Sequence, residues 1–363
     1  MGRCRFSTLG DSCIGMSKLY IGVYPDSLAS QSPKEKVVMQ RRDLLKLAAY
    51  GAGALAIGRR GVAQPEPNHH RIIDAHIHLF DPSRPGGVPW PEKDDAVLYK
   101  PSTPERYVAM SAKFGVVGAI AIEASPLATD NQWLLNVAAN HPVIVGIVGD
   151  LVPGTPAYLG DLERLHANPL FLGFRYGNLW NRDLAIDLKK PGFMDGLNAL
   201  SQAGLVFESA NPDPSLIRAI LEVSDRVDGL RIVIDHLPHA PIPADDAGRK
   251  EYEANLHRLG ENPHVFVKLS EIPVVTNGRL VKDPAYYQAP LDSIWNVFGE
   301  GRILFGSDWP NSDHVAPFAD TISIVKGYIS RKSPGAAEKY FWKNSIAAYK
   351  WRPRKPDQPA LAV

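Results

Sequence analysis

Short runs of β-branched and other apolar residues alternate with longer stretches of amphipathic pattern between residues 71 and 310. The runs recur about 33 residues apart, which is the length of one strand followed by a crossover helix. They are nearly continuously apolar, which is typical of parallel strands that are covered on both faces. Eight such runs are present, at residues 71–80, 116–124, 143–152, 170–177, 205–210, 231–237, 265–271 and 302–310.

The stretches between the runs carry the start and stop signals of helices. Several begin with Pro, Asp or Ser and end at Gly, as helices commonly do. The predicted helices are residues 104–113, 130–141, 157–167, 192–204, 214–227 and 247–260. Eight strand-and-helix units predict a single closed (β/α)8 TIM barrel over residues 70–352. The alternative is an open doubly wound sheet, but no Gly-rich phosphate loop follows the first run.

Segments outside these units are expected to shape the mouth of the barrel and to close it. Residues 80–104 form a long Pro-rich loop after the first strand, and residues 272–289 form a second insertion. Barrel enzymes usually build substrate walls from loops at the carboxyl ends of their strands. Residues 316–332 and 335–351 are expected to be C-terminal closing helices, and residues 353–363 a flexible tail.

Residues 39–63 have the layout of a twin-arginine export signal. Arg41 and Arg42 precede a Gly- and Ala-rich apolar run that ends at Ile57, and small residues lead up to Ala63, where a signal peptidase would cut. The run is too short for a membrane span of ~20 residues. We therefore expect export by the twin-arginine machinery, no stable membrane insertion, and a periplasmic or secreted mature protein. A cytosolic amphipathic helix is the alternative.

The composition limits the classes of partner and the kinds of metal site that we expect for this chain. A chain with 45% hydrophobic and 22% charged residues is neither disordered nor a coiled coil. Its net charge of +1 provides no field that favours nucleic acid, so a small-molecule substrate is expected. The two cysteines, Cys4 and Cys13, precede the export signal, which excludes a disulfide scaffold or a cysteine-ligated metal from the barrel. Any metal would have to be held by histidines and carboxylates.

Ionisable residues gather where the apolar runs end, and barrels have their active sites at the carboxyl ends of the strands. His76 and His78 lie two positions apart at the end of the first run, so their side chains share one face of the strand. His236 ends the sixth run and Asp308 the eighth. Four such groups at one end of a barrel indicate a functional site.

Further charged residues lie within or at the ends of other runs. They are Glu123, Arg175, Glu208 and Lys268. Buried charges are costly unless they are paired or bind a metal, so their convergence requires a partner for each. An ion pair between Glu123 and Lys268 across the barrel is one structural alternative to a catalytic role.

Five segments of the chain together resemble a known family. They are DAHIHLFDP (74–82), GFRYG (173–177), VIDHLP (233–238), VFVKLSE (265–271) and RILFGSDWP (302–310). They resemble the amidohydrolase-related (amidohydrolase 2) family of the amidohydrolase superfamily. Within it, they are similar to the branch of TIM-barrel metal-dependent hydrolases that contains sugar lactonases and 2-pyrone-4,6-dicarboxylate lactonase. The resemblance extends from about Arg71 to Trp351.

The resemblance implies roles for individual residues. His76 and His78 match the strand-one pair that binds a divalent metal. Asp308 matches the strand-eight aspartate, which is the general base and a further metal ligand. His236 matches the strand-six histidine that contacts the attacking water or the substrate carbonyl. Arg175 matches a strand-four arginine that binds carboxylate or hydroxyl groups of the substrate.

The chain departs from the family pattern at strand five, where many metal-dependent members have a histidine. Glu208 is the nearest residue of ligand type and could complete a site of two histidines and a carboxylate suited to Zn²⁺, or it could face the helices. Some lactonases of this branch work without a metal, so a metal-bound site and a metal-free site are both kept as alternatives. Tyr176, Trp180 and Trp309 are expected to contact the substrate at the barrel mouth.

The activity implied is hydrolysis of a lactone, either a sugar-acid lactone or a carboxylated cyclic ester. With a metal, bound water has a pKa lowered towards ~7, and Asp308 takes its proton. Without one, His76, His78 and His236 polarise the carbonyl while Asp308 activates water directly. The alternatives are a decarboxylase of an unsaturated or aromatic acid and a barrel that only binds a ligand.

The export signal also predicts the start of translation. Such a signal normally begins close to its start codon, and Met39 lies directly before Gln40. We therefore expect translation to begin at Met39 and residues 1–38 to lie upstream of the true start. N-terminal sequencing of the unprocessed precursor is expected to begin with Met39, and a precursor that begins with Met1 would contradict this.

Overall fold

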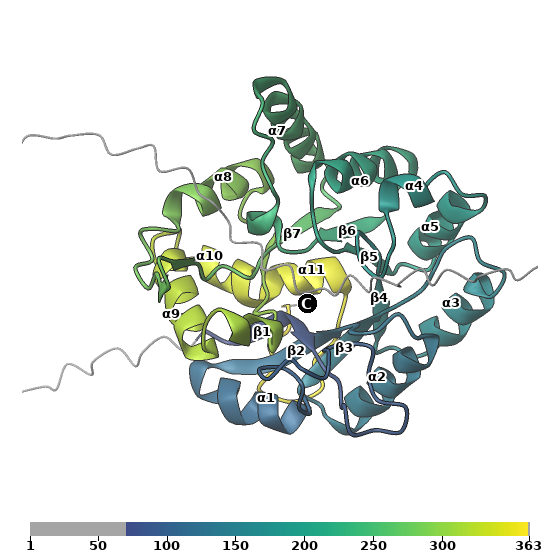
Figure 1. The fold of residues 1–363 in the computed structure, drawn as a ribbon, viewed down its shortest axis with the longest axis horizontal. Coiled ribbons are helices and arrows are strands. Elements are labelled where there is room, and N and C mark those ends of the chain that lie inside the picture. Colours follow the sequence, from purple (N-terminus) through teal and green to yellow (C-terminus); the bar gives the residue numbers. More distant parts are fainter. Residues whose placement is uncertain (1–69, 362–363) are drawn as a thin grey trace, which may run out of the picture. The chain divides into compact units, whose positions relative to one another are not determined.

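The computed structural model describes residues 70–361, and within them each of the eight apolar runs forms a parallel strand. Each strand pairs with the next one along the chain (Figure 1). The strands are β1 (Ile72–His78), β2 (Val116–Ile122), β3 (Ile144–Gly149), β4 (Phe171–Arg175), β5 (Val206–Ser209), β6 (Arg231–Ile234), β7 (Val265–Leu269) and β10 (Ile303–Phe305). The predicted order and position of the strands are confirmed.

The sheet closes on itself where β10 meets β1. The N–H of Asp308, just beyond β10, donates to the carbonyl of His76 at 2.9 Å, and the N–H of His78 donates to the carbonyl of Trp309 at 2.7 Å. On its other side β10 pairs with β7. The result is the predicted (β/α)8 barrel, in which the carboxyl ends of all eight strands meet at one mouth.

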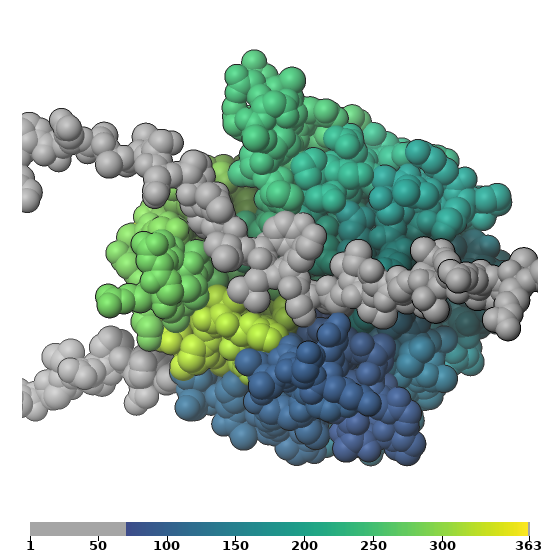
Figure 2. Space-filling view, in the orientation of Figure 1, coloured from purple at the N-terminus to yellow at the C-terminus, as the bar shows by residue number. Residues whose placement is uncertain are grey.

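Helices surround the barrel (Figure 1). Two of them begin as the sequence predicts, because Thr103 and Asp213 cap the first turns of α1 and α6 just before Pro104 and Pro214. α7 projects beyond its neighbours and buries only Tyr252 and Leu259 (Figure 2). The helices are α1 (Pro104–Ser111), α2 (Ala128–Asn140), α3 (Tyr158–His166), α4 (Leu184–Asp187), α5 (Phe193–Gln202), α6 (Pro214–Arg226), α7 (Asp246–Glu261), α8 (Gln288–Phe298), α9 (Phe318–Ile329), α10 (Ala336–Glu338) and α11 (Asn344–Tyr349).

α11 covers the end of the barrel opposite to the mouth, as expected of a closing helix. Arg231, the first residue of β6, donates from Nε to the carbonyl of Ala348 at 2.6 Å. The hydroxyl of Tyr349 enters the barrel and donates to Glu208 Oε2 at 2.5 Å. A π-helical turn at Lys339–Lys343 precedes α11 and packs against β1 and β10.

The two long loops differ in structure. Residues 80–104 join β1 to α1 with little regular structure, and a backbone bridge between Phe80 and Ser102 closes the loop at its base. Trp90 in this loop contacts the ring of His78 edge-on, with 5.6 Å between the ring centroids. Residues 272–289 contain a short hairpin, β8 (Val275–Thr276) and β9 (Arg279–Leu280). The first loop therefore contributes to the mouth of the barrel.

The C-terminal tail, which was expected to be flexible, makes hydrogen bonds to the barrel at Arg354 and Gln358. Arg354 Nη1 donates to the carbonyl of Ile144 at 2.7 Å. Gln358 is 4% exposed, and its Nε2 donates to the carbonyls of Val117 at 3.1 Å and Pro142 at 2.9 Å. The composition of the tail conceals this, because the contacts are side-chain hydrogen bonds to the backbone of distant elements.

The predicted export signal at residues 39–63 and the extension before it lie outside the described residues and stay predictions. Within residues 70–361, no helix combines the length and the apolar character that crossing a membrane requires.

Arg354→Ala is expected to destabilise the barrel, because Arg354 also donates to the carbonyls of Ala138 and Ala139 at the end of α2. Loss of hydrogen bonds from a charged donor costs about 1–3 kcal/mol. Urea unfolding followed by tryptophan fluorescence measures the free energy of unfolding. Arg352→Ala, at an exposed arginine two positions earlier, is the matched control. Equal unfolding free energies for the two variants would contradict the anchoring role.

Candidate active site

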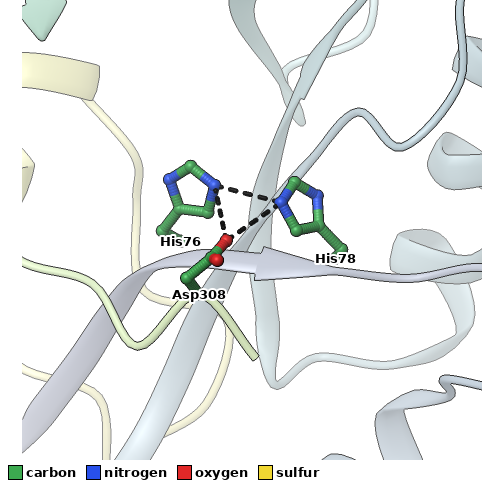
Figure 3. A group of neighbouring side chains, drawn as sticks. All are labelled: His76, His78 and Asp308. Carbon is green, nitrogen blue, oxygen red and sulfur yellow. Dashed lines mark hydrogen bonds and ion pairs between the residues drawn. The ribbon is translucent and has the colours of Figure 1, made fainter. Parts of the chain in front are cut away.

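His76, His78 and Asp308 meet at the mouth of the barrel (Figure 3). The histidines lie at alternate positions of β1, so their side chains share a face, and closure of the sheet brings Asp308 beside them. His76 Nε2 is 3.2 Å from His78 Nε2 and 3.3 Å from Asp308 Oδ1, and His78 Nε2 is 3.1 Å from the same oxygen. The structure thus brings together three of the predicted site residues.

The positions of these donor atoms fit a divalent metal. Ligand atoms around tetrahedral Zn²⁺ with bonds of ~2.0 Å lie ~3.3 Å apart, close to the separations observed here. His78 Nδ1 donates to the carbonyl of Ile122 at 3.2 Å, which leaves Nε2 unprotonated and directed at the cluster. Asp308 Oδ1 is buried and has no hydrogen-bond partner among residues 70–361. His76, His78 and Asp308 could therefore hold the cation.

His236 follows β6 and approaches Asp308 from another side. Its Nε2 is 3.9 Å from Asp308 Oδ1, and Ser270 Oγ is hydrogen-bonded to its Nδ1 at 2.8 Å. Burial lowers the pKa of His236 to about 4, although the carboxylates of Asp308 and Asp235 oppose the shift. The imidazole is therefore neutral at physiological pH, with its orientation held by Ser270.

The second oxygen of Asp308 is anchored beside the pocket. Asn311 donates from Nδ2 to Asp308 Oδ2 at 2.7 Å and to Glu271 Oε1 at 3.0 Å. Burial alone would raise the pKa of Asp308, but His236 and the two histidines of β1 together hold it well below its ordinary value. Asp308 is thus an ionised carboxylate with one oxygen anchored and the other facing the histidines.

A pocket opens at this cluster. Its lining residues are His78, Trp90, Ala124, Arg175, Leu179, Trp180, Asn211, His236, Glu271, Asp308 and Asn311. Those with left-handed backbone, with φ between 48° and 58°, are Trp180, Asn211, His236, Glu271 and Asp308. This conformation is uncommon for residues other than glycine and concentrates at functional sites, where the surrounding structure holds it. The pocket is therefore shaped by backbone turns directly after the strands.

Six pocket residues were missed by sequence reasoning, and two of them, Ala124 and Leu179, are apolar. Glu271 is the last residue of the seventh apolar run, and Asn211 directly follows the fifth, so their strand-end positions are the signal that could have found them. Asn311 lies three residues beyond Asp308 without a pattern of its own. Trp90 belongs to the 80–104 loop, whose path the sequence does not predict.

Arg175 lines the pocket as expected, but its charge is already paired. Its Nε donates to Glu123 Oε1 at 2.8 Å, and its Nη2 donates to the carbonyl of Glu123 at 2.9 Å. The indole N–H of Trp180 donates to the other carboxylate oxygen of Glu123 at 3.1 Å. Glu123 therefore pairs with Arg175, and the alternative pairing with Lys268 is wrong.

Tyr176 and Trp309 lie behind the pocket wall, which corrects the expectation that they contact the substrate. The hydroxyl of Tyr176 donates to Asp187 at 2.5 Å. Trp309 is 1% exposed and packs against Tyr107. Tyr176 directly follows Arg175 at the end of β4, and successive side chains of a strand point to opposite faces. Trp180 is the member of the expected aromatic set that lines the pocket.

Glu208 faces the barrel interior but lies below the group formed by His76, His78 and Asp308. Its Oε1 is 2.7 Å from Lys268 Nζ, and its Oε2 accepts the hydroxyl of Tyr349. The distance from His76 Nδ1 to Glu208 Oε1 is 3.9 Å, on the side of the ring away from Asp308. Burial raises the pKa of Glu208 to about 8, although Lys268 opposes the shift. The geometry therefore places Asp308, and not Glu208, beside the histidine pair.

Comparison with known proteins identifies relatives over the whole barrel. A family model described as amidohydrolase matches residues 73–351. An L-fucono-1,5-lactonase from Burkholderia ambifaria is 29% identical over 253 residues, which cover 68% of this chain and 83% of that protein. An L-fucono-1,5-lactonase from Burkholderia multivorans is 26% identical over 287 residues, which cover 76% and 94%.

Solved structures share the fold. An amidohydrolase from Burkholderia multivorans with bound zinc matches with a TM-score of 0.67 and 22% identity, over 78% of this chain and 100% of that chain. In this chain, His76, His78 and Asp308 form a group that could hold a metal ion. Because the family model spans nearly the whole described barrel, the chain belongs to the amidohydrolase family and is a hydrolase.

Proposed function

We propose that this hydrolase opens a lactone by attack of water on the ring carbonyl, with Asp308 as the general base. The observation that carries the proposal is the position of Asp308 Oδ1. It lies on the pocket wall beside three histidines, buried and without a hydrogen-bond partner in the described part of the chain. Such an oxygen can accept a proton from water. The relatives named as L-fucono-1,5-lactonases support a lactone as the substrate class.

Asp308 is arranged to move a proton in both halves of the reaction. Asn311 holds Oδ2, so Oδ1 accepts the proton of the water as its oxygen bonds to the carbonyl carbon. The same proton then passes to the ring oxygen as the ring bond breaks, which avoids a free alkoxide. A divalent cation held by His76, His78 and Asp308 would supply positive charge that polarises the reacting oxygen atoms.

His236 is placed to stabilise the charge that develops on the carbonyl oxygen. It lines the pocket, and its ring is held by Ser270. With the hydroxyl of Ser270 donating to Nδ1, the ring proton is on Nε2, which faces the cluster around Asp308. The low pKa of His236 keeps the ring neutral, so it acts as a hydrogen-bond donor to an oxyanion.

The pocket favours a neutral, hydroxylated lactone over a dicarboxylate. Arg175 carries positive charge, but Glu123 already neutralises it. Besides His78, His236 and Asp308, the other polar side chains of the wall include Asn211, Glu271 and Asn311. They offer the mixed donors and acceptors that hydroxyl groups require. Trp90 and Trp180 add apolar ring surface for the C–H face of a sugar.

Asp308→Asn tests the general base. The substitution keeps the shape of the side chain but removes the proton acceptor, so kcat for a neutral 1,5-sugar lactone is expected to fall by about 10²–10⁴. Proton release in a weakly buffered indicator assay measures ring opening. Asp313→Asn makes the same change in the same turn, at a carboxylate outside the pocket that pairs with Arg106, and is expected to keep the wild-type rate.

Three outcomes would contradict the proposal. A wild-type rate for Asp308→Asn would remove Asp308 as the base. Release of CO2 from an unsaturated or aromatic acid, without lactone turnover, would support the decarboxylase alternative. Turnover of neither class by protein of native fold would support a barrel that only binds its ligand.

We do not expect kcat/KM to fall in the pH range in which an ordinary histidine gains its proton. The pKa of His236 is about 4 and that of Asp308 lies below its ordinary value, so both groups hold their active forms well below neutrality. We expect kcat/KM to be level around neutral pH and to fall only towards about pH 4, as His236 gains its proton. Initial rates at constant ionic strength measure this, with circular dichroism as the control for folding. A midpoint near the usual histidine pKa of about 6.5 would contradict it.

A further inference from the structure

A buried ammonium group lies directly beneath the histidine pair. Lys268 Nζ is 3.0 Å from His76 Nδ1, 2.7 Å from Glu208 Oε1 and 2.9 Å from Asp235 Oδ1. The side chains of Lys268, Glu208 and Asp235 are all 0% exposed. A lysine ammonium only donates hydrogen bonds, so Lys268 donates to His76 Nδ1 and Glu208 Oε1, and its charge also forms an ion pair with Asp235.

The contact with Lys268 determines which nitrogen of His76 carries the ring proton. Because Lys268 donates to Nδ1, Nδ1 is the acceptor and the proton of the neutral ring is on Nε2. That proton faces two acceptors, because His76 Nε2 is 3.2 Å from His78 Nε2 and 3.3 Å from Asp308 Oδ1. His78 Nε2 is free to accept because the other nitrogen of that ring donates to the carbonyl of Ile122. Donors and acceptors therefore match at the contact between Lys268 and His76, while His78 Nε2 and Asp308 Oδ1, which are 3.1 Å apart, both face the proton on His76 Nε2.

To bind a metal through Nε2, His76 would need its ring proton on Nδ1 instead of Nε2. A histidine that binds a metal through Nε2 normally donates its Nδ1 proton to a carboxylate or carbonyl oxygen. Asp235 Oδ1 is in place for this role, 3.5 Å from His76 Nδ1. Lys268, however, directs a donor at the same nitrogen. Binding a cation would therefore require the His76 proton to leave Nε2 while Lys268 loses one of its three partners.

We infer that Lys268 is a positioning residue that holds His76 in the tautomer that donates from Nε2, and that it thereby weakens the affinity of the cluster for a divalent metal. The ammonium supplies buried positive charge to this part of the site, and His76 acts as a hydrogen-bond donor. This inference concerns metal occupancy and holds whatever substrate the pocket accepts, so its failure is distinguishable from failure of the lactonase proposal.

The tautomer can be measured in the unaltered protein. In ¹⁵N NMR of histidine-labelled, chelator-treated wild type, the ring of His76 is expected to show an unprotonated Nδ1 and a proton on Nε2. The His76 signals are assigned by their loss in His76→Gln, a variant used only for that purpose. A proton on Nδ1 of His76 would overturn the inference, and this measurement does not depend on a substitution at Lys268.

Substitution of Lys268 tests the effect on the metal. Lys268→Met removes the donor, so the His76 proton is expected to move to Nδ1, facing Asp235, and Zn²⁺ is expected to bind about 10–100-fold more tightly. Competition with a chromophoric chelator measures the affinity for Zn²⁺ alone. Lys282→Met removes an exposed ammonium that pairs with Asp320, and it is expected to leave the affinity unchanged. An unchanged or weaker affinity in folded Lys268→Met would overturn the inference.

Loss of Lys268 leaves Glu208 without its cation and removes one of two cations beside Asp235, the other being Arg175 at 3.6 Å. Lys268→Met combined with Glu208→Gln reduces that cost, because the amide is neutral and can still accept from Tyr349. The double variant is expected to show the same tighter binding of Zn²⁺. If circular dichroism shows that neither variant folds, the inference is tested by the NMR measurement of the His76 tautomer in the wild type.

Discussion

The closure of the barrel between β10 and β1 is the constraint on which the site depends. Two backbone hydrogen bonds join His76 and His78 to the segment that carries Asp308, so the distances among these three side chains are set by sheet geometry. Asp74 reinforces this junction, because it accepts from the N–H of Ser307 at 2.8 Å and from that of His76 at 3.2 Å. Burial raises the pKa of Asp74 to about 6, which is the electrostatic cost of placing a carboxylate there.

Inside the barrel and along the pocket wall, buried ionisable side chains are paired with one another. Arg175 is neutralised by Glu123, and Lys268 is surrounded by Glu208 and Asp235. Breaking one member of such a buried group leaves an uncompensated charge, so these residues hold each other in place. The pairing explains how these ionisable side chains can be buried inside the barrel.

The family and the chemical elements of the site could be predicted from local sequence. The H-x-H spacing places two imidazoles on one face, and the strand-end position of Asp308 places it at the same mouth. Prediction was less accurate for residues next to these. Tyr176 and Trp309 were expected in the pocket and lie behind its wall, whereas Glu271 and the asparagines were missed. The left-handed backbone of several pocket residues changes side-chain direction just where the strands end.

The sequence by itself determined the number, order and position of the strands, because hydrophobic periodicity is a local property that each segment carries independently. It also limited any metal site to histidine and carboxylate ligands, since both cysteines precede the barrel. Only the tertiary structure decided the partners of the buried charges. Lys268 meets Glu208 and His76 across 60 and 192 residues of chain, and such contacts depend on how the closed barrel aligns its strands. A side chain's neighbours across the barrel are set by strand register and closure, and a single strand contains neither.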